Sequence, residues 1–141
     1  MKIIIAGAGE VGFHLAKLLS FESQDITLID NEKANLTYAD THLDIKVVKG
    51  NSASLAVLNE AEVSSADLMI AVTSSETTNF TTCVLAKQLG VKSTVARISN
   101  TEYVSSIGDI DFKSLGIDEL ISPEEFASDE IQLLIDQSAF S

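Results

Sequence analysis

Short aliphatic runs alternate along the chain with longer stretches in which apolar residues recur at helical spacing. A run such as Lys2–Ala6, apolar at nearly every position, is typical of a strand buried on both faces of a parallel sheet. The runs predict six strands, at Lys2–Ala6, Ile26–Ile29, Ile45–Val48, Leu68–Val72, Ser93–Ile98 and Glu119–Ile121. The stretches between and after them predict helices around Val11–Leu19, Glu32–Thr41, Leu55–Leu58, Thr77–Leu89 and Glu124–Asp136.

Strands separated by helices of this length favour right-handed βαβ units in a single parallel sheet. Six strands in this rhythm predict an α/β fold with a doubly wound six-stranded parallel sheet, the Rossmann, NAD-binding type. The segment Thr101–Gly116 interrupts the rhythm, and its glycines and aspartates predict a short helix followed by a loop. Residues 1–141 are therefore expected to form one domain, with no room for a separate substrate domain.

Composition narrows the classes of partner. The 141 residues carry 9 Lys and Arg against 21 Asp and Glu, a net charge of −12 and a pI of about 4.3. This acidity disfavours nucleic acid and anionic lipid as direct partners. No apolar run approaches the roughly 18 residues of a membrane span, so we expect no direct membrane insertion. A single cysteine, Cys83, excludes an internal disulfide, fits a reducing cytoplasm and leaves no basis for a Cys/His metal site.

The first strand leads directly into the motif G-x-G-x-x-G at Gly7–Gly12 (Gly7, Ala8, Gly9, Glu10, Val11, Gly12). Its context, between a buried strand and the start of a helix, is that of a dinucleotide-binding turn. Gly7 allows the tight turn, Gly9 lets a pyrophosphate approach the backbone, and Gly12 lets helix and strand pack closely. Free N–H groups at the helix start favour the phosphates. The alternative is a plain strand-to-helix turn.

Asp30 ends the second predicted strand, 18 residues after Gly12. A carboxylate at this position accepts hydrogen bonds from the hydroxyl groups of the adenosine ribose. It also repels a 2′-phosphate, which favours NAD(H) or another adenosine nucleotide over NADP(H). The alternative is an aspartate that caps the next helix, and the two roles can coexist.

Polar side chains follow the third and fourth strands at the sheet edge where ligands of open α/β sheets bind. Asn51 is placed to meet the adenine edge, with a role in the turn alone as the alternative, and Ser52 follows it. Thr73, Ser74 and Ser75 are placed to meet ribose or phosphate, with a hydroxyl-rich helix entry as the alternative. Asn79, in the first turn of the next helix, is expected to cap that helix.

Arg97 ends the fifth strand at the same edge and is one of the chain's few basic residues. Its guanidinium suits a phosphate, whereas a structural salt bridge is the alternative. A hydride-transfer enzyme also needs a proton donor or acceptor beside the nicotinamide, and no His, Lys or Tyr couples convincingly to this edge. The pattern favours a regulatory module over an enzyme. The dinucleotide-binding part of a truncated NAD-dependent oxidoreductase and a scaffold with a degenerate site remain as alternatives.

Five segments resemble the RCK (KTN) N-terminal domain, the TrkA-like family of regulatory subunits of Trk-type potassium-uptake systems: Lys2–Gly12, Ala66–Thr73, Glu76–Asn79, Ala96–Tyr103 and Ile121–Glu124. The resemblance implies a cytoplasmic domain that binds NAD(H) or ATP/ADP and gates a potassium transporter or channel. It implies contacts to the nucleotide from Gly7 through Val11, Asp30, Asn51, Ser52, Thr73, Ser74 and Arg97.

The same resemblance implies assembly into dimers or rings beneath a membrane-embedded potassium transporter subunit, through which the protein is held at the inner membrane. Asn51 stands where many members carry an aspartate, which bears on the choice between NAD(H) and ATP/ADP. Full-length members continue into a second, ligand-sensing domain. We therefore expect residues 1–141 to be an RCK N-terminal domain that belongs to a longer chain.

Overall fold

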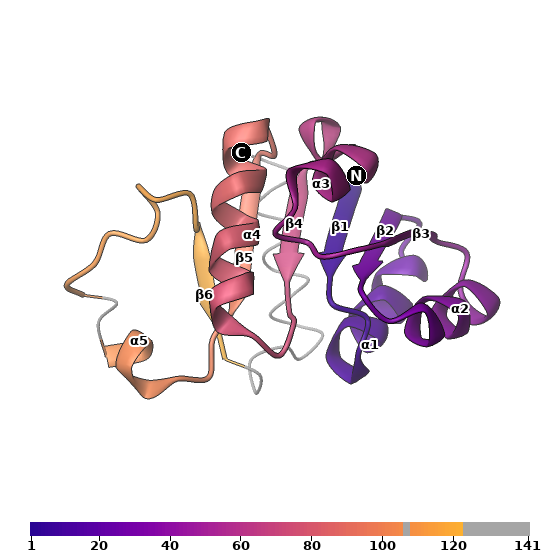
Figure 1. The fold of residues 1–141 in the computed structure, drawn as a ribbon, viewed down its shortest axis with the longest axis horizontal. Helices are drawn as coiled ribbons and strands as arrows, with labels where there is room; N and C mark the ends of the chain where they lie inside the picture. The colour runs from indigo at the N-terminus through magenta and orange to yellow at the C-terminus, as the bar shows by residue number, and fades with distance from the viewer. Residues whose placement is uncertain (106–107, 123–141) are drawn as a thin grey trace.

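The computed structural model describes residues 1–105 and 108–122, and these contain one parallel sheet of six strands (Figure 1). The strands are β1 (Lys2–Ala6), β2 (Asp25–Asp30), β3 (Lys46–Lys49), β4 (Leu68–Ala71), β5 (Ser93–Arg97) and β6 (Glu119–Ile121). They lie in the order β3-β2-β1-β4-β5-β6, and every neighbouring pair is parallel. This is the doubly wound order of Rossmann folds, so the predicted fold class is confirmed.

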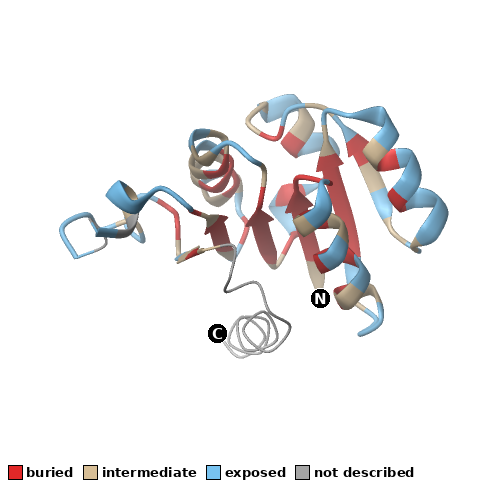
Figure 2. Ribbon diagram, turned by 90° about the horizontal axis from the view of Figure 1, so that it is seen from below, coloured by how far each residue is buried: buried red, intermediate tan, exposed pale blue. Residues whose placement is uncertain are grey.

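Helices cover both faces of the sheet. The helices of the described residues are α1 (Glu10–Ser20), α2 (Lys33–His42), α3 (Leu55–Glu60), the short 3-10 helix η1 (Val63–Ser65), α4 (Glu76–Leu89) and α5 (Thr101–Ser105), of which α1 to α4 lie over the sheet. Residues of α1 and α2 pack with Ile3 and Ile5, whereas residues of α3 and α4 pack with Ile4 and Ala6. Figure 2 shows the buried strands between helices whose outer surfaces are exposed. Because both faces are covered, β1 is aliphatic at successive positions rather than alternating.

Within the described residues, the ends of the predicted strands and helices lie within two residues of the observed ends, and β1 and β6 match without a shift. The third strand, for example, runs over Lys46–Lys49 rather than Ile45–Val48. The side chain of Ser54 caps α3 by accepting from the Val57 N–H at 3.4 Å. Gly90 ends α4 with a φ of 119°, a left-handed conformation that favours glycine. The predicted helix Glu124–Asp136 lies outside the described residues.

The α4 face of the core contains the chain's single cysteine. Cys83 is fully buried between α4 and β5, and its Sγ lies 3.5 Å from the carbonyl oxygen of Val95. Burial raises the pKa of its thiol, and the nearby charge of Asp118 raises it further. As expected from its apolar neighbours in the sequence, Cys83 is a small core residue.

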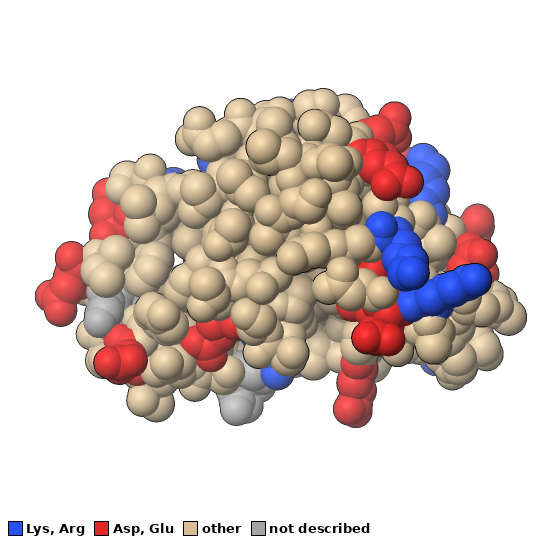
Figure 3. Space-filling view, viewed as in Figure 1, with Lys and Arg blue, Asp and Glu red and all other residues tan. Residues whose placement is uncertain are grey.

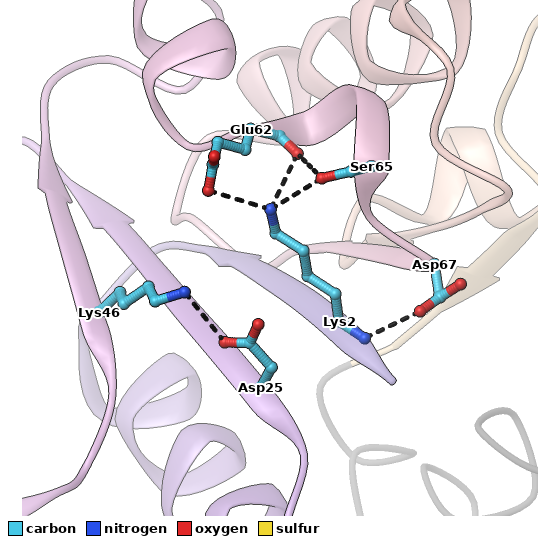
Figure 4. A network of polar contacts seen from close by, with 6 residues as sticks. All are labelled: Lys2, Asp25, Lys46, Glu62, Ser65 and Asp67. Atoms are coloured by element: carbon cyan, nitrogen blue, oxygen red, sulfur yellow. Dashed lines mark hydrogen bonds and ion pairs between the residues drawn. The ribbon is translucent and has the colours of Figure 1, made fainter.

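Polar contacts gather at the edge of the sheet where the strands begin (Figure 4). The Nζ of Lys2 donates to the Glu62 carbonyl and carboxylate and to the Ser65 hydroxyl, at distances of 3.2, 3.3 and 2.9 Å. The backbone N–H of Lys2 donates to Asp67 Oδ2 at 2.8 Å, and Lys92 Nζ lies 3.1 Å from Asp67 Oδ1. These contacts tie the start of β1 to η1 and to the residue that precedes β4.

Asp67 makes this edge sensitive to acid. The hydrogen bond from the Lys2 backbone lowers the pKa of Asp67 against the opposing effect of burial, and Lys92 lowers it further. A carboxyl group with a lowered folded-state pKa stabilises the fold above about pH 4, and this contribution is lost as pH falls through that pKa. We expect Asp67→Asn to lower the unfolding free energy by about 1 kcal/mol at neutral pH, and by progressively less below about pH 4.

Urea denaturation of the Asp67→Asn protein and of the unmodified chain, from neutral pH to below about pH 4, measures the difference in their unfolding free energies. Asp25→Asn is a suitable control because Asp25 lies at the same edge in an exposed ion pair with Lys46. A difference between Asp67→Asn and the unmodified chain that stays constant with pH would contradict the assignment.

None of the helices within residues 1–105 and 108–122 has the length and apolar character needed to cross a membrane. Figure 3 shows the face formed by α3 and α4 as largely free of charged side chains, which gather at its margins.

Candidate functional site

A cleft of about 570 Å³ opens at the carboxyl ends of the strands, the edge opposite the contacts of Figure 4. The turn between β1 and α1 lines it, together with segments that follow β2, β3 and β4 and with Arg97 at the end of β5. The cleft thus spans the point between β1 and β4 where the strand order reverses, the usual ligand position in such sheets. The predicted residues that line it are Gly7, Gly9, Glu10, Val11, Asp30, Asn51, Ser52, Thr73, Ser74, Ser75 and Arg97.

The three glycines of the turn have different structural roles. Gly7 has a φ of 113°, and a Cβ there would come within 2.9 Å of the Thr73 backbone nitrogen. A Cβ at Gly12 would overlap the carbonyl oxygen of Gly7, so the start of α1 packs directly on the turn. At Gly9, by contrast, a Cβ would meet no atom within 4 Å. Gly9, the position that the sequence predicts to let a pyrophosphate approach the backbone, is therefore the one with open space beside it.

The first turn of α1 adds unpaired donors beside this space. Gly9 occupies the N-cap position of α1, and no side chain accepts a hydrogen bond from the helix start. Backbone N–H groups at an uncapped helix N-terminus attract anions, helped by the helix dipole. Glu10, in the first turn, lines the same cleft and is exposed.

Asp30 is held in place by three donors. Its Oδ1 accepts from the Ala8 N–H, and its Oδ2 accepts from the Glu32 N–H and from Asn35 Nδ2, each at 3.1 Å. The carboxylate therefore joins the end of β2 to the glycine turn and to the entry of α2. Asp30 is not the N-cap of α2, which is Glu32, although it bonds the N–H of that cap residue.

The residues after β3 divide between turn and packing roles. Asn51 is exposed at the cleft, and its Oδ1 accepts from the Ala53 N–H at 2.8 Å, so the predicted turn role is present. Ser52 is buried, and its hydroxyl lies 2.8 Å from that of Thr82 in α4. The Ser52 hydroxyl therefore connects this loop to α4.

The loop after β4 also bonds to α4. The Thr73 hydroxyl and N–H both lie within hydrogen-bond distance of Asn79 Oδ1, at 2.6 and 2.9 Å. The expectation that Asn79 caps α4 is wrong, because Ser75 is the cap and its hydroxyl oxygen accepts from the Thr78 N–H at 3.2 Å. Asn79 is instead fully buried, one turn further into the helix. Ser74 is exposed at the cleft.

Arg97 lines the cleft at the end of β5. Its Nε is buried without a hydrogen-bond partner, and none of the ion pairs among the described residues includes it. The nearby Glu76 carboxylate accepts from the N–H and the hydroxyl of Ser99, each at 2.8 Å. Burial raises the pKa of Glu76, but the bonds from Ser99 and the charge of Arg97 lower it overall. A cationic side chain with an unsatisfied N–H favours an anion in the cleft.

Two predicted residues, Ala8 and Gly12, do not line the cleft. The Ala8 N–H is used by Asp30, and Gly12 packs against Gly7, so both shape the turn from behind. Sequence reasoning missed several polar residues that do line it: Asn31, Glu32, Asn35 and Thr78. For Asn31 and Glu32 the available signal was their position directly after the end of β2. Within the described residues, no cluster of His, Cys, Asp and Glu could hold a metal ion.

Comparison with known proteins places the chain. Residues 3–123 match the TrkA-N domain family. The chain belongs to this family. The TrkA-N domain is 36% identical over 135 residues to "Trk system potassium uptake protein TrkA homolog" of Methanothermobacter thermautotrophicus, covering 96% of this chain and 60% of the relative. It is 43% identical over 137 residues to "Trk system potassium uptake protein TrkA" of Haemophilus influenzae, covering 96% and 30%. The domain therefore spans only part of these relatives.

Solved structures agree with the fold of this TrkA-N domain. The TrkA-N domain of the inner membrane protein ybaL from Escherichia coli matches with a TM-score of 0.75 at 16% identity, covering 96% of this chain and 94% of that chain. The structure titled "GsuK channel bound to NAD" matches with a TM-score of 0.70 at 17% identity, covering 85% and 21%. At these identities the likeness concerns the fold.

Proposed function

We propose that this TrkA-N domain is the nucleotide-binding regulatory domain of a potassium-uptake system. The observation that carries the proposal is Arg97, which lines the cleft with a buried Nε that no acceptor satisfies. The glycine turn and the uncapped start of α1 offer N–H groups to the same cleft, so both features favour an anionic ligand. Relatives named as Trk potassium uptake proteins support the potassium-transport setting.

The proposed ligand is NAD(H), with ATP or ADP as the alternative. Asp30 and Glu32 place two carboxylates at the β2 end of the cleft, which suits ribose hydroxyl groups and repels a 2′-phosphate. The backbone of Gly7–Val11 would bind the pyrophosphate, and Asn51 with Ser52 would lie along the adenosine. Thr73, Ser74 and Arg97 would contact the other half of the ligand. The GsuK channel, which shares the fold, has structures bound to NAD and to ADP, and these support an adenine nucleotide as the ligand.

The domain is proposed to act as a regulator rather than an enzyme. Of the described residues that line the cleft, the ionisable ones are Glu10, Asp30, Glu32 and Arg97. A regulator needs no proton-transfer group, whereas a dehydrogenase places one beside the nicotinamide. Bound nucleotide would instead favour one conformation of the assembly over another and so shift the transporter between states.

The proposed setting is cytoplasmic, with a membrane-embedded potassium transporter subunit as partner and assembly into dimers or rings. The largely uncharged face of α3 and α4 supports self-association, because two copies with a net charge of −12 repel each other least there. Leu55 adds an exposed apolar side chain at the start of α3. Light scattering of the purified chain measures the oligomeric state, and a monomer at all concentrations would oppose this part of the proposal.

A thermal-shift panel of NAD, NADH, NADP, ATP and ADP tests the proposed function. A ligand at 100 times its dissociation constant stabilises the folded state by about 2.7 kcal/mol, which raises the melting temperature by several degrees. We expect this rise with NADH, and a much smaller one with NADP because of Asp30 and Glu32. The NADH absorbance should stay constant, as no turnover is expected. A melting temperature that no nucleotide raises would refute the proposal.

A further inference from the structure

Asn79 is a buried amide near the start of α4 whose side-chain hydrogen bonds all reach outside the helix. Its Oδ1 accepts from the Thr73 N–H at 2.9 Å and from the Thr73 hydroxyl at 2.6 Å. Its Nδ2 donates to the backbone carbonyl oxygens of Thr73 and Arg97, each at 3.1 Å. Both donors and both acceptor positions of the amide are thus used. A flipped amide would face the two carbonyls with its oxygen, so the partners fix its orientation.

These bonds lie just beyond the point where the sheet ladder ends. The pairing of β4 with β5 runs from Leu68 opposite Ser93 to Ala71 opposite Ala96. Past this point, Asn79 supplies the N–H donors for the carbonyls of Thr73 and Arg97. One side chain from α4 therefore bridges the two strand ends at the cleft.

Asparagine is a poor choice for this position on local grounds. Its side chain competes with the backbone for hydrogen bonds, which makes it unfavourable inside a helix. A polar group that is fully buried is also costly unless every one of its hydrogen bonds is made. The four bonds to Thr73 and Arg97 offset both costs, and no apolar residue could make them.

We infer that Asn79 is a positioning residue, which sets the spacing of Thr73 and Arg97 for the non-adenosine half of a dinucleotide, its phosphate included. The inference rests on the proposed function, because it names how one half of that ligand is recognised. Asn79 has no exposed surface, so it acts through Thr73 and Arg97 and does not touch the ligand. The adenosine half is expected against Asp30 and Asn51, and none of the four bonds of Asn79 reaches either residue.

The adenosine half is proposed to lie at the ends of β2 and β3, and the other half at the ends of β4 and β5. Loss of the Asn79 hydrogen bonds should therefore weaken the binding of a ligand that occupies both halves more than that of a ligand that occupies only the adenosine half. NADH occupies both halves of the cleft, whereas AMP occupies the adenosine half. Asn79→Asp keeps the size of the side chain but replaces the two N–H donors with an oxygen that faces two carbonyls. We expect the affinity for NADH to fall at least about tenfold and that for AMP to change less than about twofold, measured by calorimetry.

Cys83→Ala is the matched control, since Cys83 lies one turn further along α4, is equally buried and does not line the cleft. The affinities of the Cys83→Ala protein for NADH and for AMP should both stay unchanged, even if its melting temperature falls. Equal losses for NADH and AMP in Asn79→Asp, or no loss for either, would overturn the inference. An unmodified chain that binds neither probe would instead overturn the proposed function.

A measurement on the unmodified chain covers the case in which Asn79→Asp does not fold. The side-chain amide signals of Asn79 in an NMR spectrum report directly on its bonds to Thr73 and Arg97. Saturating NADH should shift these signals, and saturating AMP should leave them in place. The same response to both nucleotides would contradict the assignment of Asn79 to one half of the cleft.

Discussion

Gly12→Ala is expected to lower the unfolding free energy by about 3 kcal/mol or more, and the melting temperature by about 10 °C. The added Cβ would overlap the carbonyl oxygen of Gly7, a backbone atom that cannot move away without displacing the whole turn. Helix propensity alone predicts the opposite sign, because alanine is favoured over glycine by about 1 kcal/mol inside a helix. Thermal and urea denaturation therefore distinguish packing from propensity by the sign of the change.

Gly9→Ala is the matched control for this substitution. A Cβ at Gly9 meets no atom within 4 Å, so stability should stay within about 0.5 kcal/mol of the unmodified chain. The same methyl group lies where a pyrophosphate is proposed to approach the backbone, so nucleotide binding should weaken. A Gly12→Ala protein as stable as the Gly9→Ala protein would contradict the account of the turn.

Arg97→Met is expected to weaken nucleotide binding by about tenfold or more while leaving the unliganded fold as stable as before, or slightly more stable. The guanidinium is proposed to bind the anionic ligand, and a charge-assisted hydrogen bond of this kind contributes about 1.5–3 kcal/mol. In the unliganded protein its buried Nε has no acceptor, so methionine removes an unsatisfied polar group while keeping an apolar stem.

Lys17→Met controls for the change in net charge, since Lys17 is exposed in the last turn of α1 and does not line the cleft. Calorimetric titration with NADH measures the affinity of each protein for the nucleotide, and the melting temperature of each unliganded protein measures the stability of its fold. Equal affinities in the Arg97→Met and Lys17→Met proteins would show that Arg97 does not bind the ligand.

Much of the candidate site could be predicted from the sequence, because one topological rule places it. Parallel strands joined by helices bring their carboxyl ends to a single edge, so Asp30, Asn51, Thr73 and Arg97 were expected together although they are far apart in the chain. The glycine motif was equally informative. Its spacing reflects backbone contacts, such as that of Gly12 with Gly7, which depend little on neighbouring side chains.

The side-chain network behind the cleft could not be predicted in the same way. Asn79 looked like a cap because it follows a strand end closely, yet its partners include the carbonyl of Arg97, 18 residues away. The buried hydroxyl of Ser52 likewise pairs with that of Thr82, which reaches it from α4. Such hydrogen bonds depend on how closely α4 packs against the sheet, and the spacing of apolar residues in the sequence does not predict that distance.

The position of Cys83 has a consequence for oxidative signalling. Cysteine reacts with peroxides and disulfides as the thiolate, and the raised pKa of Cys83 keeps it protonated behind packed side chains. The chain contains no other cysteine. Oxidants therefore find no reactive thiol in this sequence. Under the proposed function, a change in the redox state of the cell would reach the domain as a changed ratio of NADH to NAD at the cleft, and would be reversed as soon as that ratio recovered.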